Sequence, residues 1–372
     1  MKPTAGTFLD LFFDLCSRPN SAEKDIVSCA GETWTYGDLH VISASVASTI
    51  GNQYGPRPTV ALISENHPYV IVLLLAVWKL GGIVAPLDCH APADLMEAML
   101  QNIAPSFIVA SLPDIVHNLD IPIELIEPET YTITALAQRF LHLSHIVPTD
   151  FCILPQPDDV CLYIHTSSAS SVSNLKCVPV THHSLVMNGR SQLAWFQRNL
   201  PGVSLEYLRV LGWSLFSHIM SICFDLGTSV LMTGGCYIFA LMPSMYSIAT
   251  RSEVEGQFDV PTLLLDAILK HQPDAFAAVP WVLDGLMHAW NAEIDLLRRS
   301  RIDTALQNLK YFISAGAATN EEGMTELGGV LFHSLLSEAA SGWRNEDSCI
   351  DDAIFTLIDE NGDTADTGFV DI

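Results

Sequence analysis

The feature that most constrains the fold of this chain is a regular alternation of short apolar runs with helical segments in its first half. Thr59–Ile63, Ile83–Leu87 and Ser106–Ala110 are apolar runs of strand length. Between them, Pro68–Leu80 and Ala91–Asn102 have the length and pattern of helices. Repeated strand–helix units of this length predict a parallel sheet covered by helices.

The alternation continues in the second half of the chain, after a proline-containing connection at about residues 113–159. We predict helices at His183–Arg198, Phe216–Leu226 and Val260–His271, and strands at Leu208–Trp213, Val230–Met232, Cys236–Leu241, Asp274–Val279 and Leu309–Ile313. The whole pattern predicts an α/β protein with two subdomains, residues 1–150 and 151–372.

The charge balance of the chain limits its partners. It carries 42 acidic and 17 basic residues, for a net charge of −25, which argues against nucleic acid or an anionic membrane surface as a partner. The 9 cysteines contain no CxxC pair, as is typical of reduced thiols in an intracellular protein. The first residues do not form a signal peptide. We therefore expect a cytoplasmic protein.

Two apolar segments could be taken for membrane spans. Tyr69–Trp78 ends at a lysine and is too short to cross a bilayer, so we expect a buried core helix there. Leu226–Ala249 is uncharged and long enough, but three glycines and Pro243 divide it into strand-sized and turn-sized pieces. A membrane protein is therefore the less favoured alternative.

A serine-rich loop, Thr166–Asn174, is the segment that most suggests a chemistry. A buried strand is predicted just before it at Val160–His165, Lys176 follows it, and Thr181 has the position of an N-cap for the next helix. Hydroxyls and backbone N–H groups can surround a phosphate while an ammonium neutralises part of its charge. The loop has no glycine, although phosphate loops usually need one for close backbone approach.

Taken in order along the chain, these segments resemble the adenylate-forming superfamily, which includes acyl-CoA synthetases, luciferases and the adenylation domains of non-ribosomal peptide synthetases. The resemblance implies the large N-terminal domain of that fold, with mixed and parallel sheets flanked by helices. It rests on segments that are similar to the family elements TYxEL, KxGGxxxPL, TSGTTGxPKxVxxTH, SGGA and YGxTE, namely Gly31–Leu39, Trp78–Leu87, Thr166–His182, Ser314–Ala317 and Ser337–Glu338.

The resemblance also implies a two-step reaction. A small carboxylic acid attacks the α-phosphate of ATP with Mg²⁺ present, giving an acyl-adenylate and pyrophosphate. The thiol of coenzyme A, or the phosphopantetheine of a carrier domain, then takes the acyl group. Lysine, loop hydroxyls and the metal would screen the triphosphate while the two anions approach each other.

The resemblance assigns roles to individual residues. Lys176 and the loop hydroxyls would bind the triphosphate, Ser337 would bond a phosphate oxygen, and Glu338 would hold the magnesium. The loop hydroxyls are those of Thr166, Ser167, Ser168, Ser170 and Ser171. The residues beside the adenine would be Ala315, Gly316 and Ala317, and the acyl pocket would include Trp213, His218, Val279 and Ser314. His218 could equally be a core histidine bonded to a carbonyl.

The sequence also departs from the family pattern. Ser168 and Ser171 stand at glycine positions of the phosphate loop, Leu175 replaces a proline, and Ile372 comes before the TGD element is reached. We therefore expect the small C-terminal lid and its catalytic lysine to be missing, and assign no catalytic residue. Two readings stay open: an N-terminal portion of an acid-activating enzyme, or a truncated non-catalytic relative that binds nucleotide or acyl groups weakly. The apolar pocket favours an aryl or aliphatic acid.

Overall fold

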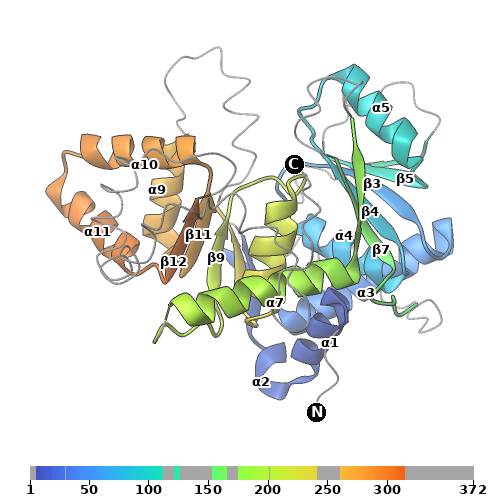
Figure 1. Ribbon diagram of the computed structural model, residues 1–372, viewed down its shortest axis with the longest axis horizontal. Helices are drawn as coiled ribbons and strands as arrows, with labels where there is room; N and C mark the ends of the chain where they lie inside the picture. The colour runs from blue at the N-terminus through green and yellow to red at the C-terminus, as the bar shows by residue number, and fades with distance from the viewer. Residues whose placement is uncertain are drawn as a thin grey trace.

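The computed structural model describes residues 6–29, 31–111, 121–125, 153–165, 175–200, 202–240 and 260–314. Within these residues the chain forms two six-stranded sheets with helices packed against them (Figure 1). Each sheet is parallel apart from one antiparallel pair. The predicted mixed α/β class is therefore confirmed.

The first sheet has the order β12–β11–β9–β10–β1–β2. It joins an early hairpin to strands from the second half of the chain, with Val27 of β1 in register with Tyr237 of β10. The bounds are β1 Asp25–Cys29, β2 Glu32–Thr35, β9 Arg209–Gly212, β10 Cys236–Phe239, β11 Ala275–Ala278 and β12 Tyr311–Ser314.

The second sheet has the order β6–β5–β3–β4–β7–β8. Its centre is the predicted parallel pair β3–β4, in which Thr59 is in register with Ile83. The bounds are β3 Thr59–Ile63, β4 Ile83–Leu87, β5 Phe107–Ala110, β6 Ile123–Leu125, β7 Val160–His165 and β8 Cys177–Thr181. Helix α5 (Ala93–Ile103) connects β4 to β5, as the alternating pattern predicts.

Each sheet takes strands from both sides of residue 150. The early strands β1 and β2 extend the sheet of β9 to β12, and the later strands β7 and β8 extend the sheet of β3 to β6. Sheet membership therefore does not follow sequence order. The residues on either side of the boundary predicted at residue 150 lie outside the described residues, and that division stays a prediction.

One apolar core connects the two sheets. It contains Val27 and Tyr237 from the first sheet, Val60 and Leu162 from the second, and residues of five helices between and around them. These helices are α1 (Phe8–Ser17), α3 (Tyr36–Tyr54), α4 (Pro68–Lys79), α7 (His182–Asn199) and the π-helix η5 (Ser221–Leu231). Helix α2 (Pro19–Ala22) is a short turn after α1. The core is thus common to both halves of the chain.

Helix α4 is buried along its whole length, which confirms the prediction of a core helix at Tyr69–Trp78. Pro68 occupies its first turn, and the Nδ1 atom of His67 accepts the N–H of Tyr69 (3.0 Å). The helix ends before Gly81, whose φ of +64° favours glycine. The buried ammonium of Lys79 donates to the carbonyl of His40 (3.1 Å) and to Oγ of Ser43 (2.5 Å).

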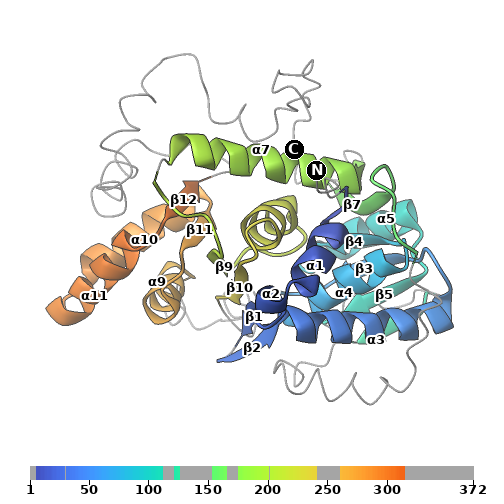
Figure 2. The ribbon, with the colours of Figure 1, turned by 90° about the horizontal axis from the view of Figure 1, so that it is seen from below.

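Helix α7 extends from the second sheet to the first (Figures 1 and 2). It begins at the end of β8, and near its other end the ring of Phe196 stacks on Tyr311 of β12 with 4.6 Å between centroids. The predicted helix at His183–Arg198 is confirmed by this element. Both sheets are therefore held by one continuous helix as well as by the shared core.

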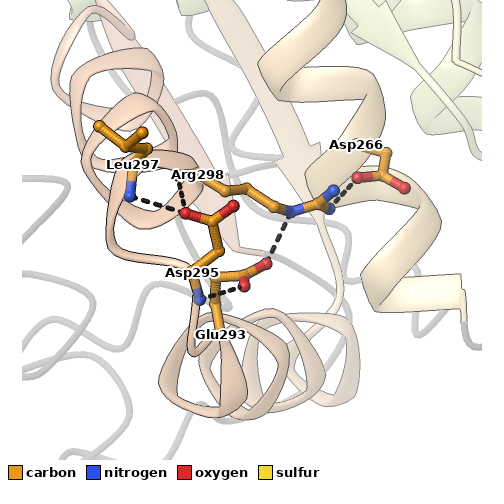
Figure 3. Close-up of polar contacts among 5 residues, drawn as sticks. All are labelled: Asp266, Glu293, Asp295, Leu297 and Arg298. Atoms are coloured by element: carbon orange, nitrogen blue, oxygen red, sulfur yellow. Dashed lines mark hydrogen bonds and ion pairs between the residues drawn. The ribbon is translucent and has the colours of Figure 1, made fainter.

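Three helices form a second, smaller core beside β9 and β11. These are α9 (Val260–His271), α10 (Pro280–Ala292) and α11 (Leu296–Gln307). Figure 3 shows how polar contacts fix the turn between the last two: Oδ1 of Asp295 accepts the N–H of Leu297 (2.9 Å), and Arg298 pairs with Glu293 (2.6 Å) and with Asp266 on α9. Because these charges are partly exposed, the contacts orient the turn more than they stabilise the fold.

The segment after β9 differs from the sequence prediction. The predicted strand Val230–Met232 is wrong, because Val230 and Leu231 lie in η5, and the helix predicted from Phe216 begins at Ser221. A short apolar run does not distinguish a strand from a buried helix. Among the described residues no helix is both long and apolar enough to cross a bilayer; residues 241–249 of the candidate span lie outside that part of the chain.

The N-terminal cap of α3 provides a test of local stability. Oγ1 of Thr35 accepts the N–H of Asp38 (3.1 Å), and the Asp38 carboxylate accepts the N–H of Thr35 (3.0 Å). The variant Thr35→Ala leaves a helix N–H without its acceptor, so we expect it to lower the free energy of unfolding by about 1 kcal/mol. Urea unfolding measures the change. Thr35→Ser keeps the hydroxyl, and an equal loss in both variants would contradict this account.

Candidate functional site

The candidate phosphate-binding loop is attached to an antiparallel hairpin at the edge of the second sheet. β7 and β8 pair up to His165 and Cys177, which are directly opposite each other, so the chain leaves the sheet at one and returns at the other. Lys176 is exposed and lies one residue before this last pair. The loop residues Thr166, Ser167, Ser168, Ser170 and Ser171 lie outside the described residues.

His165 is a residue at this position that the sequence analysis did not select. Both of its ring nitrogens are buried, and neither has a hydrogen-bond partner among the described residues. Burial lowers the pKa of His165, so the imidazole is neutral at pH 7 and can donate or accept one hydrogen bond at each nitrogen. A histidine directly before a hydroxyl-rich loop was the available signal.

Thr181 and His182 connect the hairpin to the core. Oγ1 of Thr181 accepts the N–H of Ser184 (3.1 Å), which confirms Thr181 as the N-cap of α7. The His182 ring packs edge-on against Trp78 with 5.5 Å between centroids, and the indole N–H of Trp78 donates to the carbonyl of Cys161 (3.1 Å). Two of the family-like segments, Trp78–Leu87 and Thr166–His182, are therefore in direct contact.

Three of the predicted acyl-pocket residues lie at one edge of the first sheet. Trp213 follows β9, Val279 follows β11, and Ser314 is the last residue of β12. These strands are parallel, so their carboxyl ends share an edge, where ligands of open α/β sheets commonly bind. The indole N–H of Trp213 donates to the carbonyl of Ala277 (2.6 Å), which fixes the ring against β11.

His218 lies on the connection between β9 and η5. Its side chain is exposed, and its backbone N–H donates to the carbonyl of Leu215 (3.0 Å). His218 is therefore not a buried core histidine. The adenine-side residues Ala315, Gly316 and Ala317, together with Ser337 and Glu338, lie outside the described residues.

Asn66 brings the two sheets together at this edge. It follows β3, and its Nδ2 atom donates to the carbonyls of Trp213 and Ser214, both at 2.9 Å. The carboxyl end of β3 in the second sheet therefore meets the carboxyl end of β9 in the first. A run of polar residues directly after a buried strand, Ser64–His67, was the sequence signal for this contact.

The described residues offer neither a metal cluster nor a nucleophilic thiol. No group of three or more His, Cys, Asp and Glu side chains suited to a metal is found in that part of the chain. Burial raises the pKa of every described cysteine, for example to about 11 for Cys16 and about 12 for Cys223. These thiols are protonated at neutral pH, whereas reactive cysteines have lowered pKa values.

Comparison with known proteins gives the family. The sequence profile of AMP-binding enzymes matches residues 17–339. Hispidin synthase of Neonothopanus nambi is 34% identical over 389 residues, covering 97% of this chain and 23% of that protein. Tyrocidine synthase 3 of Brevibacillus parabrevis is 24% identical over 298 residues, covering 79% of this chain and 4% of that protein. The chain thus spans a quarter or less of these two relatives.

The fold is shared with solved structures of distant sequence. VinN in complex with L-aspartate has a TM-score of 0.67 at 14% identity, covering 87% of this chain and 73% of that one. The N-terminal subdomain of Klebsiella oxytoca NpsA, in complex with 3-hydroxybenzoyl-AMSN, has a TM-score of 0.62 at 15% identity, covering 87% and 70%. The fold is therefore the α/β fold of these adenylate-forming neighbours, and the match over residues 17–339 defines the class of enzyme. The chain belongs to the AMP-binding enzyme family.

The burial of His182 predicts a pH dependence of stability. Burial lowers the pKa of His182 from 6.5 to about 4. Above pH 6.5 His182 is neutral in both the folded and the unfolded chain. Below pH 6.5 the unfolded chain gains a proton that the folded chain does not bind. The free energy of unfolding therefore falls as the pH falls from 6.5 toward 4. At pH 5 the loss from this residue is about 2 kcal/mol.

Urea unfolding at pH 7.5 and pH 5 measures this effect. His182→Phe removes the titrating group, and we expect the fall in unfolding free energy between the two pH values to shrink by about 2 kcal/mol. His183→Phe is the matched control, because His183 is exposed and its substitution should leave the fall unchanged. If the unfolding free energy of His182→Phe fell between pH 7.5 and pH 5 by as much as that of the wild type, this histidine would not be held neutral by the fold.

Proposed function

We propose that this chain binds ATP and activates a carboxylic acid as its acyl-adenylate. In this reaction a carboxylate oxygen attacks the α-phosphorus, the bond from that phosphorus to the bridging oxygen of the β-phosphate breaks, and pyrophosphate leaves. The family match over residues 17–339 is the observation that carries the proposal. ATP use is further supported by a structural neighbour, ATP-bound MatB of Rhodopseudomonas palustris, with a TM-score of 0.63.

The triphosphate would be bound at the β7–β8 hairpin. Lys176 supplies an exposed ammonium beside the loop hydroxyls, and such a local positive charge is needed in a chain with a net charge of −25. Mg²⁺ is usually held by one or two carboxylates together with substrate phosphates, so one glutamate, Glu338, would suffice on the protein side. Ser337 would bond a phosphate oxygen, and Ala315–Ala317 would lie beside the adenine.

The acid would bind at the carboxyl edge of the first sheet. Trp213, Val279 and Ser314 gather at that edge, and the exposed His218 is on the adjoining connection. The Trp213 ring packs edge-on against Trp281 with 6.3 Å between centroids. Aromatic and aliphatic walls of this kind favour an aryl or aliphatic acid over a charged one.

A second step would transfer the acyl group to a thiol. The sulfur attacks the acyl carbonyl, the mixed anhydride bond breaks, a thioester forms and AMP leaves. Relatives that include tyrocidine synthase 3 and the NRPS-like oxidoreductase FscA of Fusarium equiseti support a carrier phosphopantetheine as the acceptor, with coenzyme A as the alternative.

The first step is tested by acid-dependent ATP–pyrophosphate exchange with the purified 372-residue chain. We expect exchange with aryl or aliphatic acids and a loss of about 10²-fold in Lys176→Ala, the usual effect of removing one group that stabilises transition-state charge. Lys270→Ala is the matched control, because Lys270 is exposed on α9 and the same charge is removed far from the hairpin.

Equilibrium binding of ATP separates the two readings of the chain. Binding that is weakened by Lys176→Ala but not by Lys270→Ala, with no exchange for any acid, would identify a non-catalytic nucleotide-binding relative. The glycine-free phosphate loop is the observation that favours that alternative. Absence of both exchange and ATP binding would contradict the proposed function altogether.

A further inference from the structure

Four polar side chains lie around the carboxyl end of β9, and each has a buried atom without a hydrogen-bond partner among the described residues. The atoms are Oδ1 of Asn66, Oγ of Ser217, Oδ1 of Asp225 and Oη of Tyr237. We name these residues the β9-end cluster. They come from the end of β3, the segment after β9, the helix η5 and the strand β10, so distant parts of the chain contribute to one place.

Contacts with the end of β9 and the segment after it place the four residues around one stretch of chain. Asn66 donates to the carbonyls of Trp213 and Ser214, and Ser217 follows on the same segment. A Cβ added to Gly212, the last residue of β9, would lie 2.1 Å from the phenolic oxygen of Tyr237, so that oxygen lies directly over the end of the strand.

Asp225 is held beside the same segment by its helix. Oγ of Ser221 donates to the carbonyl of Ser214 (3.1 Å), which fixes the first turn of η5 against the connection from β9. Asp225 lies about one turn further along, and the pKa of the Tyr237 phenol is raised, chiefly by burial and to a lesser degree by the proximity of Asp225. The carboxyl and the phenol therefore lie near each other.

These polar groups lower the stability of the folded chain. Asp225 is 2% exposed and Tyr237 is 0% exposed, and most buried polar atoms in proteins have partners. Asp225 is also the one Asp, Glu, Lys or Arg residue between positions 210 and 250. An apolar residue at either position would avoid the unsatisfied group, and π-helices such as η5 are frequent at functional sites. A ligand that completes these hydrogen bonds explains why they are present.

The character of the cluster indicates what kind of group it would bind. Burial raises the pKa of Asp225 well above its ordinary value, which favours the protonated carboxyl, a group that can both donate and accept. Tyr237 is flanked by aromatic rings, Phe239 at 4.8 Å and Phe216 at 5.5 Å between centroids. A neutral hydroxyl, which also donates and accepts, matches this set of groups.

We propose that the β9-end cluster binds a neutral hydroxyl group on the acid substrate, so that the chain prefers a hydroxyl-bearing carboxylic acid to the same acid without the hydroxyl. Asp225 and Tyr237 are the specificity-determining residues. Trp213, on the same segment, would pack against the body of the acid. The inference rests on the proposed function, because it takes the carboxyl edge of the first sheet as the acid site.

The test compares matched acids that differ by one hydroxyl: benzoate with 3- and 4-hydroxybenzoate, and hexanoate with 6-hydroxyhexanoate. ATP–pyrophosphate exchange should favour a hydroxy acid over its partner by at least tenfold, because loss of the ligand hydroxyl leaves buried groups unpaired. Tyr237→Phe and Asp225→Leu should lower this preference at least tenfold. Asp225→Asn keeps two hydrogen-bonding groups and should retain part of it.

Folding of the variants is checked by thermal unfolding. Since the Tyr237 hydroxyl has no partner in the described part of the chain, Tyr237→Phe should have a Tm equal to or above that of the wild type, so a lost preference cannot be ascribed to unfolding. Tyr54→Phe is the matched control: Tyr54 stacks on Phe107 of the second sheet, and its substitution should leave the preference unchanged.

A second readout does not require turnover. A hydroxy acid should raise the Tm of the wild-type chain more than its partner acid does, and this difference should vanish in Tyr237→Phe. The inference would be overturned if a hydroxy acid and its partner acid gave the same exchange rate and the same rise in Tm, in the wild type and in Tyr237→Phe alike. The cluster would then be a water-binding site only. Preference for α-amino acids that depends on Asp225 would also overturn it, since an ammonium would be the ligand.

The two proposals fail in different ways. If neither exchange nor ATP binding occurs with any acid, the proposed function is wrong. In that case, a larger rise in Tm with a hydroxy acid than with its partner acid would still support the cluster as a hydroxyl site. If exchange occurs without discrimination between matched acids, the proposed function stands and the inference about the β9-end cluster is wrong.

Discussion

The arrangement of the two sheets depends on the burial of α4 in the core that they share. Every residue of this helix is buried, and the core around it includes side chains from both sheets and from α1, α3, α7 and η5. Full burial of a large apolar side chain is worth about 1.5–3 kcal/mol, so this one helix makes a large contribution to holding the sheets in a single body. The strand edges that meet beside Asn66 have a fixed position because of it.

A core of this strength tolerates buried polar atoms at the strand edge that have no partner within the described part of the chain. Asp225 and Tyr237 are as buried as the apolar residues around them, and a buried polar atom left without a hydrogen bond costs about 1–3 kcal/mol. Natural proteins commonly break local rules of stability where a ligand binds. The contrast with Lys79 is informative, because that buried ammonium has its hydrogen bonds to His40 and Ser43 and serves the structure.

Sequence patterns were sufficient where neighbouring segments pair with each other. The strands β3, β4 and β5 and the cap at Thr181 follow from local periodicity and residue type. The pairing of β1 with β10 could not be predicted, because Val27 and Tyr237 are far apart in the sequence and no local signal links them. The helical state of Val230 was missed because a short apolar run suits a strand and a buried helix equally.

Only those residues of the candidate site that belong to recognisable sequence segments could be predicted. Trp213 and Val279 could be proposed for the acyl pocket because they end predicted strands in segments that resemble the adenylate-forming family. Asn66 and Asp225 could not, because their importance depends on what surrounds them in space. A single charged residue in a long uncharged stretch was the one sequence sign of Asp225.

Electrostatics explains why the proposed triphosphate and acid sites lie on different sheets. The proposed reaction brings a carboxylate to a triphosphate in a chain with a net charge of −25, so positive charge must be concentrated where the anions meet. The exposed Lys176 is placed at the edge of the second sheet, whereas the phenol of Tyr237 on β10 and the carboxyl of Asp225 on η5, whose pKa is raised by burial, lie at the first sheet. A substrate with its charge at one end and a neutral polar group at the other fits both environments. Asn66 joins the end of β3 to the segment after β9, so the two environments belong to one connected part of the fold.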